Sequence, residues 1–202
     1  MFMVSQSAPL ARLTVANLIT LVRIVLTPVF ILCLIQGYYR PALLIFLLAG
    51  LSDLADGLIA RRFGQKTPLG AFLDPLADKL LVCSSFITLA IYRLVPAWLT
   101  VVVFSRDLIL ALGVLVFKLA DYPLTIKPSW TGKWTTTFQL LSVFLVLLGK
   151  GWSLPGNFLQ GCFWVTGVLT VSSGLHYMAD GLRQVSQVQA ERRQGNQHGP
   201  GH

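Results

Sequence analysis

Long apolar stretches alternate with short polar segments along most of the chain. Uninterrupted apolar runs of about 18 residues or more are typical of helices that cross a lipid bilayer. The pattern therefore predicts an all-α polytopic membrane protein with six transmembrane helices. The predicted spans are Val15–Ile35, Ala42–Arg61, Gly70–Tyr92, Trp98–Leu119, Trp134–Leu148 and Leu159–Leu182.

The basic residues predict the orientation of these spans, because cytoplasmic loops carry an excess of Lys and Arg. An even number of crossings places both termini on one side, together with the even-numbered loops. The basic residues on that side are Arg12, Arg61, Arg62, Lys66, Lys118, Lys127, Lys133, Arg183, Arg192 and Arg193. The opposite side carries Arg40, Arg93 and Lys150. We therefore expect an integral protein of the cytoplasmic membrane with both termini in the cytosol.

Composition fits this class of protein, since the 202 residues are 54% hydrophobic and only 12% charged. The net charge of +8 is explained by orientation and by anionic lipid headgroups, so we expect no nucleic-acid partner. Cys33, Cys83 and Cys162 fall in predicted spans without metal-ligand spacing, and we expect them to be packing residues.

One domain accounts for most of the chain, since the sequence shows no internal repeat. We expect a cytoplasmic N-terminal segment over residues 1–13, a membrane domain over 14–185 and a polar cytoplasmic tail over 186–202. The Gly, Gln and Pro content from Gln184 onward predicts that this tail is at least partly disordered.

Four carboxylates interrupt the second and third apolar spans, at Asp53, Asp56, Asp74 and Asp78. They are half of the eight acidic residues in the chain. An ionised side chain in hydrocarbon costs about 2.5 kcal/mol or more, so four of them require compensation. Bound cations are the most direct source of that compensation. The second and third spans therefore contain the predicted functional site, and we expect this site to face the cytosol.

Helical periodicity gathers these carboxylates on two faces, because side chains about 100° apart in sequence repeat every three to four residues. Small residues and one arginine share the faces, which should let a bulky ligand approach closely. Pro68 suits the first turn of the third helix, and Pro75 should disturb that helix between Asp74 and Asp78. The second helix presents Asp53, Asp56, Gly57, Ala60 and Arg61, and the third presents Gly70, Asp74 and Asp78.

Facing carboxylates repel each other unless positive charge lies between them, and hard divalent cations select oxygen ligands of this kind. Four ligands allow two Mg²⁺ or Mn²⁺ ions. A diphosphate is the natural ligand for such ions, because metals bridge and neutralise phosphate oxygens. Arg61 either holds a phosphate or extends to the membrane interface.

These residues together match a known pattern, Asp53-x2-Asp56-Gly57-x2-Ala60-Arg61-x8-Gly70-x3-Asp74-x3-Asp78. It resembles the signature of the CDP-alcohol phosphatidyltransferase family. The resemblance implies transfer of the phosphatidyl group of CDP-diacylglycerol to an alcohol, with release of CMP, and it suggests a homodimer.

The resemblance also implies residue roles. Asp53, Asp56 and Asp74 would bind metal, and Asp78 would bind a second metal ion and deprotonate the acceptor hydroxyl. The CDP moiety would contact Asp56, Gly57, Ala60, Arg61 and Gly70. The segment from Ala16 to Arg23 resembles the opening segment of bacterial members, so Asn17 and Thr20 border the nucleotide site or join helices, and Arg23 serves the active site.

The acceptor alcohol is predicted from two basic positions, Arg106 and Lys133, which suit an anionic acceptor that contains glycerol. Arg106 alternatively forms a structural pair with Asp107. The run from Lys127 to Gln139 resembles a segment of phosphatidylglycerophosphate synthases, which favours glycerol 3-phosphate. The Arg106-Asp107 pair is closer to cardiolipin synthases that use phosphatidylglycerol, so that acceptor stays open.

Two rival classes use similar residues. A membrane prenyltransferase combines aspartates, metal and diphosphate, but the Asp-Gly-x-x-Ala-Arg core argues against it. An ion-coupled transporter places carboxylates along its path, but transporters usually show paired halves, and none is evident here. An enzyme of phosphatidyl transfer is the favoured prediction.

Overall fold

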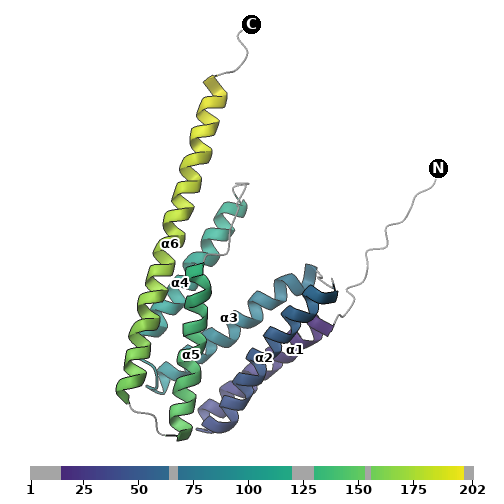
Figure 1. Ribbon diagram of the computed structural model, residues 1–202, viewed down its shortest axis with the longest axis vertical. Coiled ribbons are helices and arrows are strands. Elements are labelled where there is room, and N and C mark those ends of the chain that lie inside the picture. Colours follow the sequence, from purple (N-terminus) through teal and green to yellow (C-terminus); the bar gives the residue numbers. More distant parts are fainter. Residues whose placement is uncertain (1–14, 64–67, 120–129, 153–155, 198–202) are drawn as a thin grey trace, which may run out of the picture. The chain divides into compact units, whose positions relative to one another are not determined.

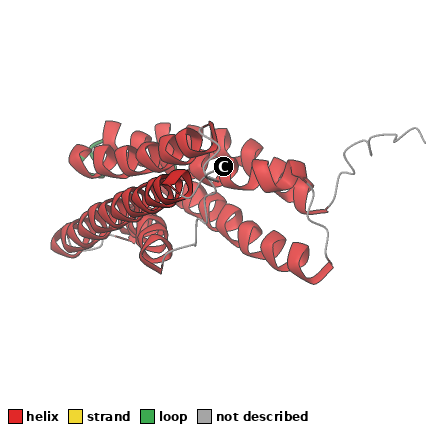
Figure 2. Cartoon of the chain, turned by 90° about the horizontal axis from the view of Figure 1, so that it is seen from above, coloured by secondary structure: helices red, strands yellow, loops and turns green. Residues whose placement is uncertain are grey.

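The computed structural model describes residues 15–63, 68–119, 130–152 and 156–197, and within them the side chains of residues 18–52, 76–116, 119, 130–150, 156–184 and 186. The described residues form six α-helices and no strand (Figure 1, Figure 2). The predicted all-α class is therefore confirmed. The helices are α1 (Val15–Ile35), α2 (Tyr39–Phe63), α3 (Pro68–Ile91), α4 (Ala97–Leu119), α5 (Trp130–Trp152) and α6 (Gly156–Gln197).

The helix bounds follow the apolar pattern closely, and α1 has the predicted limits. Pro68 is the first residue of α3, as expected for a residue whose missing N–H has no intrahelical partner at that position. Pro75 does not end α3, which is helical without a break from Pro68 to Ile91, and a bend of the helix at this residue stays a prediction. Membrane helices tolerate an internal proline when neighbouring groups satisfy the carbonyl that it leaves unpaired.

Helix α6 continues into the predicted polar tail as far as Gln197, and residues 198–202 lie outside the described residues, so the partial disorder of the tail stays a prediction. The predicted apolar span of this helix ends at Leu182. Beyond it, the segment from Val185 to Gln194 contains Gln, Ala, Glu and Arg, which favour helix, and no glycine occurs before Gly195. Local propensity therefore extends the helix past its apolar part.

Two helices end in the same hydrogen-bonded motif. At the end of α1, the N–H of Tyr38 donates to the carbonyl of Cys33 and the N–H of Gly37 to that of Leu34, with Gly37 at φ 75°. At the end of α3, Arg93 takes the equivalent place at φ 56°. Both are Schellman caps, which satisfy the last carbonyls of a helix and turn the chain toward the next one.

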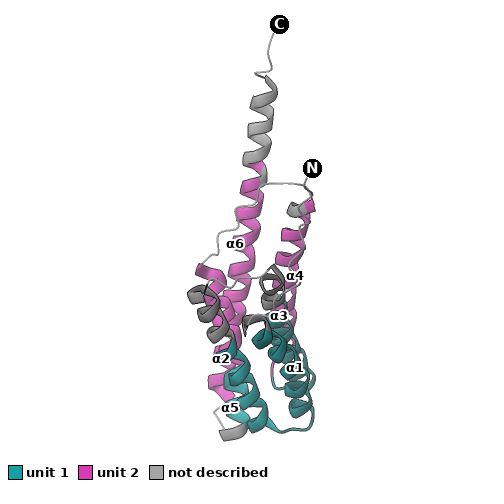
Figure 3. Cartoon of the chain, turned by 90° about the vertical axis from the view of Figure 1, so that its right-hand side faces the viewer, with its two compact units in different colours: residues 1–94, 143–154 teal, residues 95–142, 155–202 magenta. Residues whose placement is uncertain are grey.

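The described helices form two compact units (Figure 3). Unit 1 comprises residues 1–94 and 143–154, and so contains α1, α2 and α3. Helix α1 packs against both α2 and α3 (Figure 1). The rings of Phe30 on α1 and Phe46 on α2 lie 5.9 Å apart, and Ala42 and Ala49 let the two backbones approach.

Unit 2 comprises residues 95–142 and 155–202, and so contains α4, the first half of α5, and α6. Helix α4 packs against α6. Trp98 on α4 lies against Trp164 on α6, with ring centroids 4.9 Å apart. Gly167 provides the room for this ring, because a Cβ at that position would lie 2.6 Å from Cζ3 of Trp98.

Several polar side chains are buried inside the units beside the apolar core, and many large apolar side chains are exposed. On α1, the buried stripe contains Thr20, Arg23 and Thr27, whereas Leu18 and Val25 are 57% and 65% exposed. This inverted pattern suits a hydrocarbon solvent, where exposed apolar surface costs nothing. Among the described residues, three segments are long and apolar enough to cross a membrane: Leu18–Ile35, Ala97–Val116 and Gly156–Gln184.

Gly167→Ala should destabilise the protein by about 1–3 kcal/mol, because the new methyl group overlaps the Trp98 ring. Gly161→Ala on the same helix is the matched control, since nothing lies within 4 Å of its added Cβ. Thermal unfolding in detergent measures both variants. An unfolding temperature for Gly167→Ala equal to that of Gly161→Ala would contradict the close α4–α6 approach.

Candidate active site

The motif positions occupy two helices that share one neighbour. Helix α2 carries five of them, α3 carries three, and α1 packs against both helices. Asp78 is the motif residue whose side chain the structure describes. The side chains of Asp53, Asp56, Gly57, Ala60, Arg61, Gly70 and Asp74 lie outside the described residues, so their convergence stays a prediction.

Asp78 forms an ion pair with an arginine of another helix. The Nη1 group of Arg23 on α1 donates to Oδ1 of Asp78 on α3 over 2.6 Å. The Arg23 side chain is 0% exposed, whereas that of Asp78 is 46% exposed. The guanidinium is therefore enclosed, and the carboxylate that it holds is still open to a ligand.

The stripe around Arg23 explains how a charged group is held inside unit 1. Thr20 and Thr27 flank it on the same face of α1, and both are buried. Thr27 donates its hydroxyl hydrogen to the carbonyl oxygen of Arg23. A buried arginine is costly unless it is paired. The sequence predicts that Arg23 serves the site, and its hydrogen bond to Asp78 supports this prediction.

A carboxylate in this setting fits a divalent cation. Asp78 offers hard oxygen ligands, and its partial exposure gives a cation access. Asp74 precedes it by one helical turn on the unbroken α3, so both positions share one side of the helix. No group of three or more His, Cys, Asp or Glu side chains gathers among the described residues, which include only one motif carboxylate.

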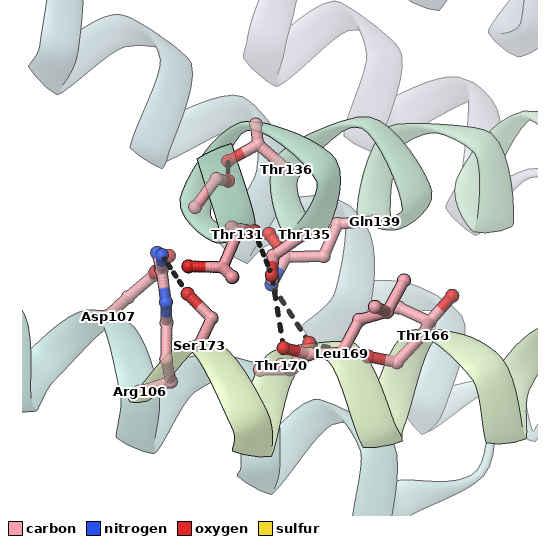
Figure 4. A network of polar contacts seen from close by, with 11 residues as sticks. Arg106, Asp107, Thr131, Thr135, Thr136, Gln139, Thr166, Leu169, Thr170 and Ser173 are labelled. Carbon is pink, nitrogen blue, oxygen red and sulfur yellow. Dashed lines mark hydrogen bonds and ion pairs between the residues drawn. The ribbon is translucent and has the colours of Figure 1, made fainter. Parts of the chain in front are cut away.

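Unit 2 contains a second buried arginine. Arg106 on α4 donates through Nη1 to Oδ1 of the adjacent Asp107 over 2.8 Å and through Nη2 to the hydroxyl of Ser173 on α6 over 3.0 Å (Figure 4). The Tyr177 ring lies 5.7 Å from its guanidinium carbon. The Nε atom is buried without a hydrogen-bond partner among the described residues. Arg106 therefore forms the structural pair with Asp107, and its Nε–H group could still donate a hydrogen bond to a ligand.

The threonine and glutamine run at the start of α5 joins α6 (Figure 4). Thr135 donates its hydroxyl hydrogen to the carbonyl of Leu169, and Gln139 donates through Nε2 to Thr170 at a long 3.4 Å. Sequence reasoning missed the partner residues on α6. Their signal was present as polar residues at helical spacing in an apolar span: Thr166, Thr170 and Ser173.

Lys133 lies at the start of α5 with an exposed side chain. Its Nζ atom is 5.3 Å from the centre of the Trp130 ring, a cation–π contact within its own helix. In the described part of unit 2, Lys133 contacts Trp130, and Arg106 contacts Asp107 and Ser173, so no contact between Lys133 and Arg106 is seen there. Lys133 is nevertheless accessible to an anion.

Comparison with known proteins agrees with the motif. The sequence matches the CDP-alcohol phosphatidyltransferase family over residues 13–172, and the chain belongs to this family. The predicted class of enzyme is confirmed, so the chain is a transferase of phospholipid synthesis.

The names of the relatives describe two different reactions, synthesis of phosphatidylglycerophosphate and synthesis of cardiolipin. A probable phosphatidylglycerophosphate synthase of Mycobacterium tuberculosis is 37% identical, covering 91% of this chain and 89% of that protein. A CDP-diacylglycerol--glycerol-3-phosphate 3-phosphatidyltransferase of Bacillus subtilis is 32% identical, covering 81% and 92%. A cardiolipin synthase (CMP-forming) of Streptomyces coelicolor is 34% identical, covering 69% and 68%.

Asp107→Asn should destabilise the protein by about 3 kcal/mol or more, because it leaves the buried Arg106 charge without its anion. Asp180→Asn is the control, since Asp180 and its partner His176 are 41% and 50% exposed, and an exposed pair contributes less than about 1 kcal/mol. Denaturant unfolding in detergent compares the variants. Equal losses would show that the Arg106–Asp107 pair does not stabilise unit 2.

Proposed function

We propose that this protein transfers the phosphatidyl group of CDP-diacylglycerol to glycerol 3-phosphate, which yields phosphatidylglycerophosphate and CMP. The observation that carries the proposal is the placement of all eight motif positions on α2 and α3, two helices that pack against the same α1. The names of the M. tuberculosis and B. subtilis relatives support this acceptor.

The reaction is a displacement at phosphorus. The acceptor hydroxyl oxygen forms a bond to the phosphatidyl phosphorus, and the bond from that phosphorus to the bridging oxygen of the diphosphate breaks. CMP leaves with the bonding electron pair, and the hydroxyl proton passes to a carboxylate. Two bound Mg²⁺ or Mn²⁺ ions would neutralise the diphosphate charge that otherwise opposes attack.

The residues of the chain position these reactants. Asp53, Asp56 and Asp74 would hold the ions, and Asp78 would both bind metal and take the hydroxyl proton. Asp78 suits this part because its side chain is accessible while Arg23 fixes its orientation. The CDP moiety would lie against Asp56, Gly57, Ala60, Arg61 and Gly70.

Arg106 and Lys133 are the proposed contacts for the acceptor phosphate. Arg106 retains its Nε donor, and the exposed Lys133 carries a mobile positive charge. Phosphatidylglycerol is the second candidate acceptor, which would make the protein a cardiolipin synthase. The Arg106-Asp107 sequence and the likeness to the S. coelicolor protein favour that alternative.

The membrane arrangement belongs to the same proposal. Six spans with cytosolic termini would place the motif end of α2 and α3 at the cytosolic surface of the cytoplasmic membrane. The excess of basic residues on that side supports this orientation. We also propose that the chain works as a homodimer, as the family resemblance suggests.

Product analysis tests the proposal directly. Purified protein receives CDP-diacylglycerol and Mg²⁺ with either glycerol 3-phosphate or phosphatidylglycerol, and the lipid product and CMP are measured. We expect phosphatidylglycerophosphate with the first acceptor, and no turnover in excess chelator. Asp74→Asn should lower turnover by more than about a hundredfold, because it removes a metal ligand. Asp180→Asn, a carboxylate outside the motif, should retain wild-type turnover.

Cardiolipin formed with phosphatidylglycerol alone would replace the proposed acceptor by the second candidate. Full turnover in excess chelator would contradict the metal-dependent mechanism altogether. Absence of CMP release with either acceptor would favour the transporter or prenyltransferase class.

Lys133→Gln should raise the KM for glycerol 3-phosphate about tenfold, because it removes one charge that attracts the acceptor phosphate. The KM for CDP-diacylglycerol should not change. Lys150→Gln is the matched control at the other end of α5, where the basic residue is also exposed. Steady-state kinetics in mixed micelles measures both constants. An equal rise in both KM values would show that Lys133 does not bind the acceptor specifically.

A further inference from the structure

Arg23 places a permanent positive charge beside the metal-binding motif. Its side chain is 0% exposed, and its Nη1 atom lies 2.6 Å from Oδ1 of Asp78. A guanidinium stays charged at any pH that a protein tolerates, so this charge does not disappear when conditions change. The helix that carries it packs against both helices of the motif.

Such a charge acts in opposite directions on the metal-free and the metal-bound protein. Without metal, it compensates part of the negative charge that the motif carboxylates concentrate within apolar helices. With metal, it repels the divalent cations that bind the same carboxylates. Water screens an enclosed charge less than an exposed one, so both effects are larger for Arg23 than for a surface arginine, although the 46% exposure of Asp78 reduces them.

The contact also restricts how Asp78 binds a cation. A charge-assisted hydrogen bond at 2.6 Å holds Oδ1 toward α1. A carboxylate engaged in this way shares its negative charge between the guanidinium and any metal ion. Arg23 is therefore more than a packing residue of α1.

We propose that Arg23 is a fixed counter-charge of the metal site, which holds Asp78 in position and lowers the affinity of the site for free divalent cations. This inference rests on the proposed function, because it takes the motif carboxylates to be metal ligands. Arg23 is a positioning residue that acts through Asp78. Because of this counter-charge, the metal site would be stable without metal and would bind divalent cations only moderately before the lipid substrate binds.

Mn²⁺ binding without any substrate tests the inference. The protein is held in an uncharged detergent, and free Mn²⁺ is measured by electron paramagnetic resonance during titration. Arg23→Gln should bind Mn²⁺ at least about tenfold more tightly than the wild type, because the repelling charge is gone. Arg23→Lys retains the charge and should bind Mn²⁺ within about threefold of the wild type.

Arg40→Gln is the control, since it removes an exposed arginine at the start of α2, outside the motif. Water and salt screen an exposed charge, so its loss should leave Mn²⁺ affinity unchanged. Unchanged or weaker Mn²⁺ binding by a folded Arg23→Gln would overturn the inference. If Arg23→Gln does not fold, Arg23→Lys decides: wild-type affinity supports the counter-charge, and loss of binding contradicts it.

Failure of the inference differs from failure of the proposed function. A wild-type protein that binds Mn²⁺, with an Arg23→Gln variant of equal affinity, would overturn only the role of Arg23. A wild-type protein that binds no Mn²⁺ and releases CMP in excess chelator would overturn both.

Discussion

Every charge inside these apolar helices needs a partner, and that requirement organises both units. In unit 1, the enclosed Arg23 pairs with Asp78 over 2.6 Å. In unit 2, the buried Arg106 pairs with Asp107 and contacts Ser173. A lone ionised group would be costly in hydrocarbon, so these pairs constrain which faces of α1, α4 and α6 point inward. Apolar contacts such as Phe30 with Phe46 then fill the space around them.

The two arginines support different functions. Arg106 is held on both sides by partners from its own unit, which suits a structural role with one donor left for a ligand. Arg23 is enclosed, but its partner Asp78 is accessible, so this pair links the interior of unit 1 to a carboxylate that a ligand can reach. The polar residues that join α5 and α6 keep the surroundings of Arg106 in place through Thr135 and Gln139.

Sequence periodicity predicted all six helices because apolar runs of this length have few alternatives in a membrane. It also placed all eight motif positions on two helices, since their spacing matches a helical repeat. It did not show that α3 runs through Pro75 as one helix, or that α6 extends past the predicted apolar span to Gln197. Partner choice was not predictable: nothing local in the sequence joins Arg23 to Asp78, which lie 55 residues apart.

The central claim is that carboxylates of α2 and α3 share divalent cations at which a nucleotide-linked lipid is cleaved. The most direct measurement is an experimental structure with Mn²⁺ and CDP-diacylglycerol bound, in which anomalous scattering locates the metal. The account predicts Mn²⁺ ions within about 2.2 Å of carboxylate oxygens from Asp53, Asp56, Asp74 and Asp78. Metal bound elsewhere, with these four side chains directed toward separate surfaces, would contradict it.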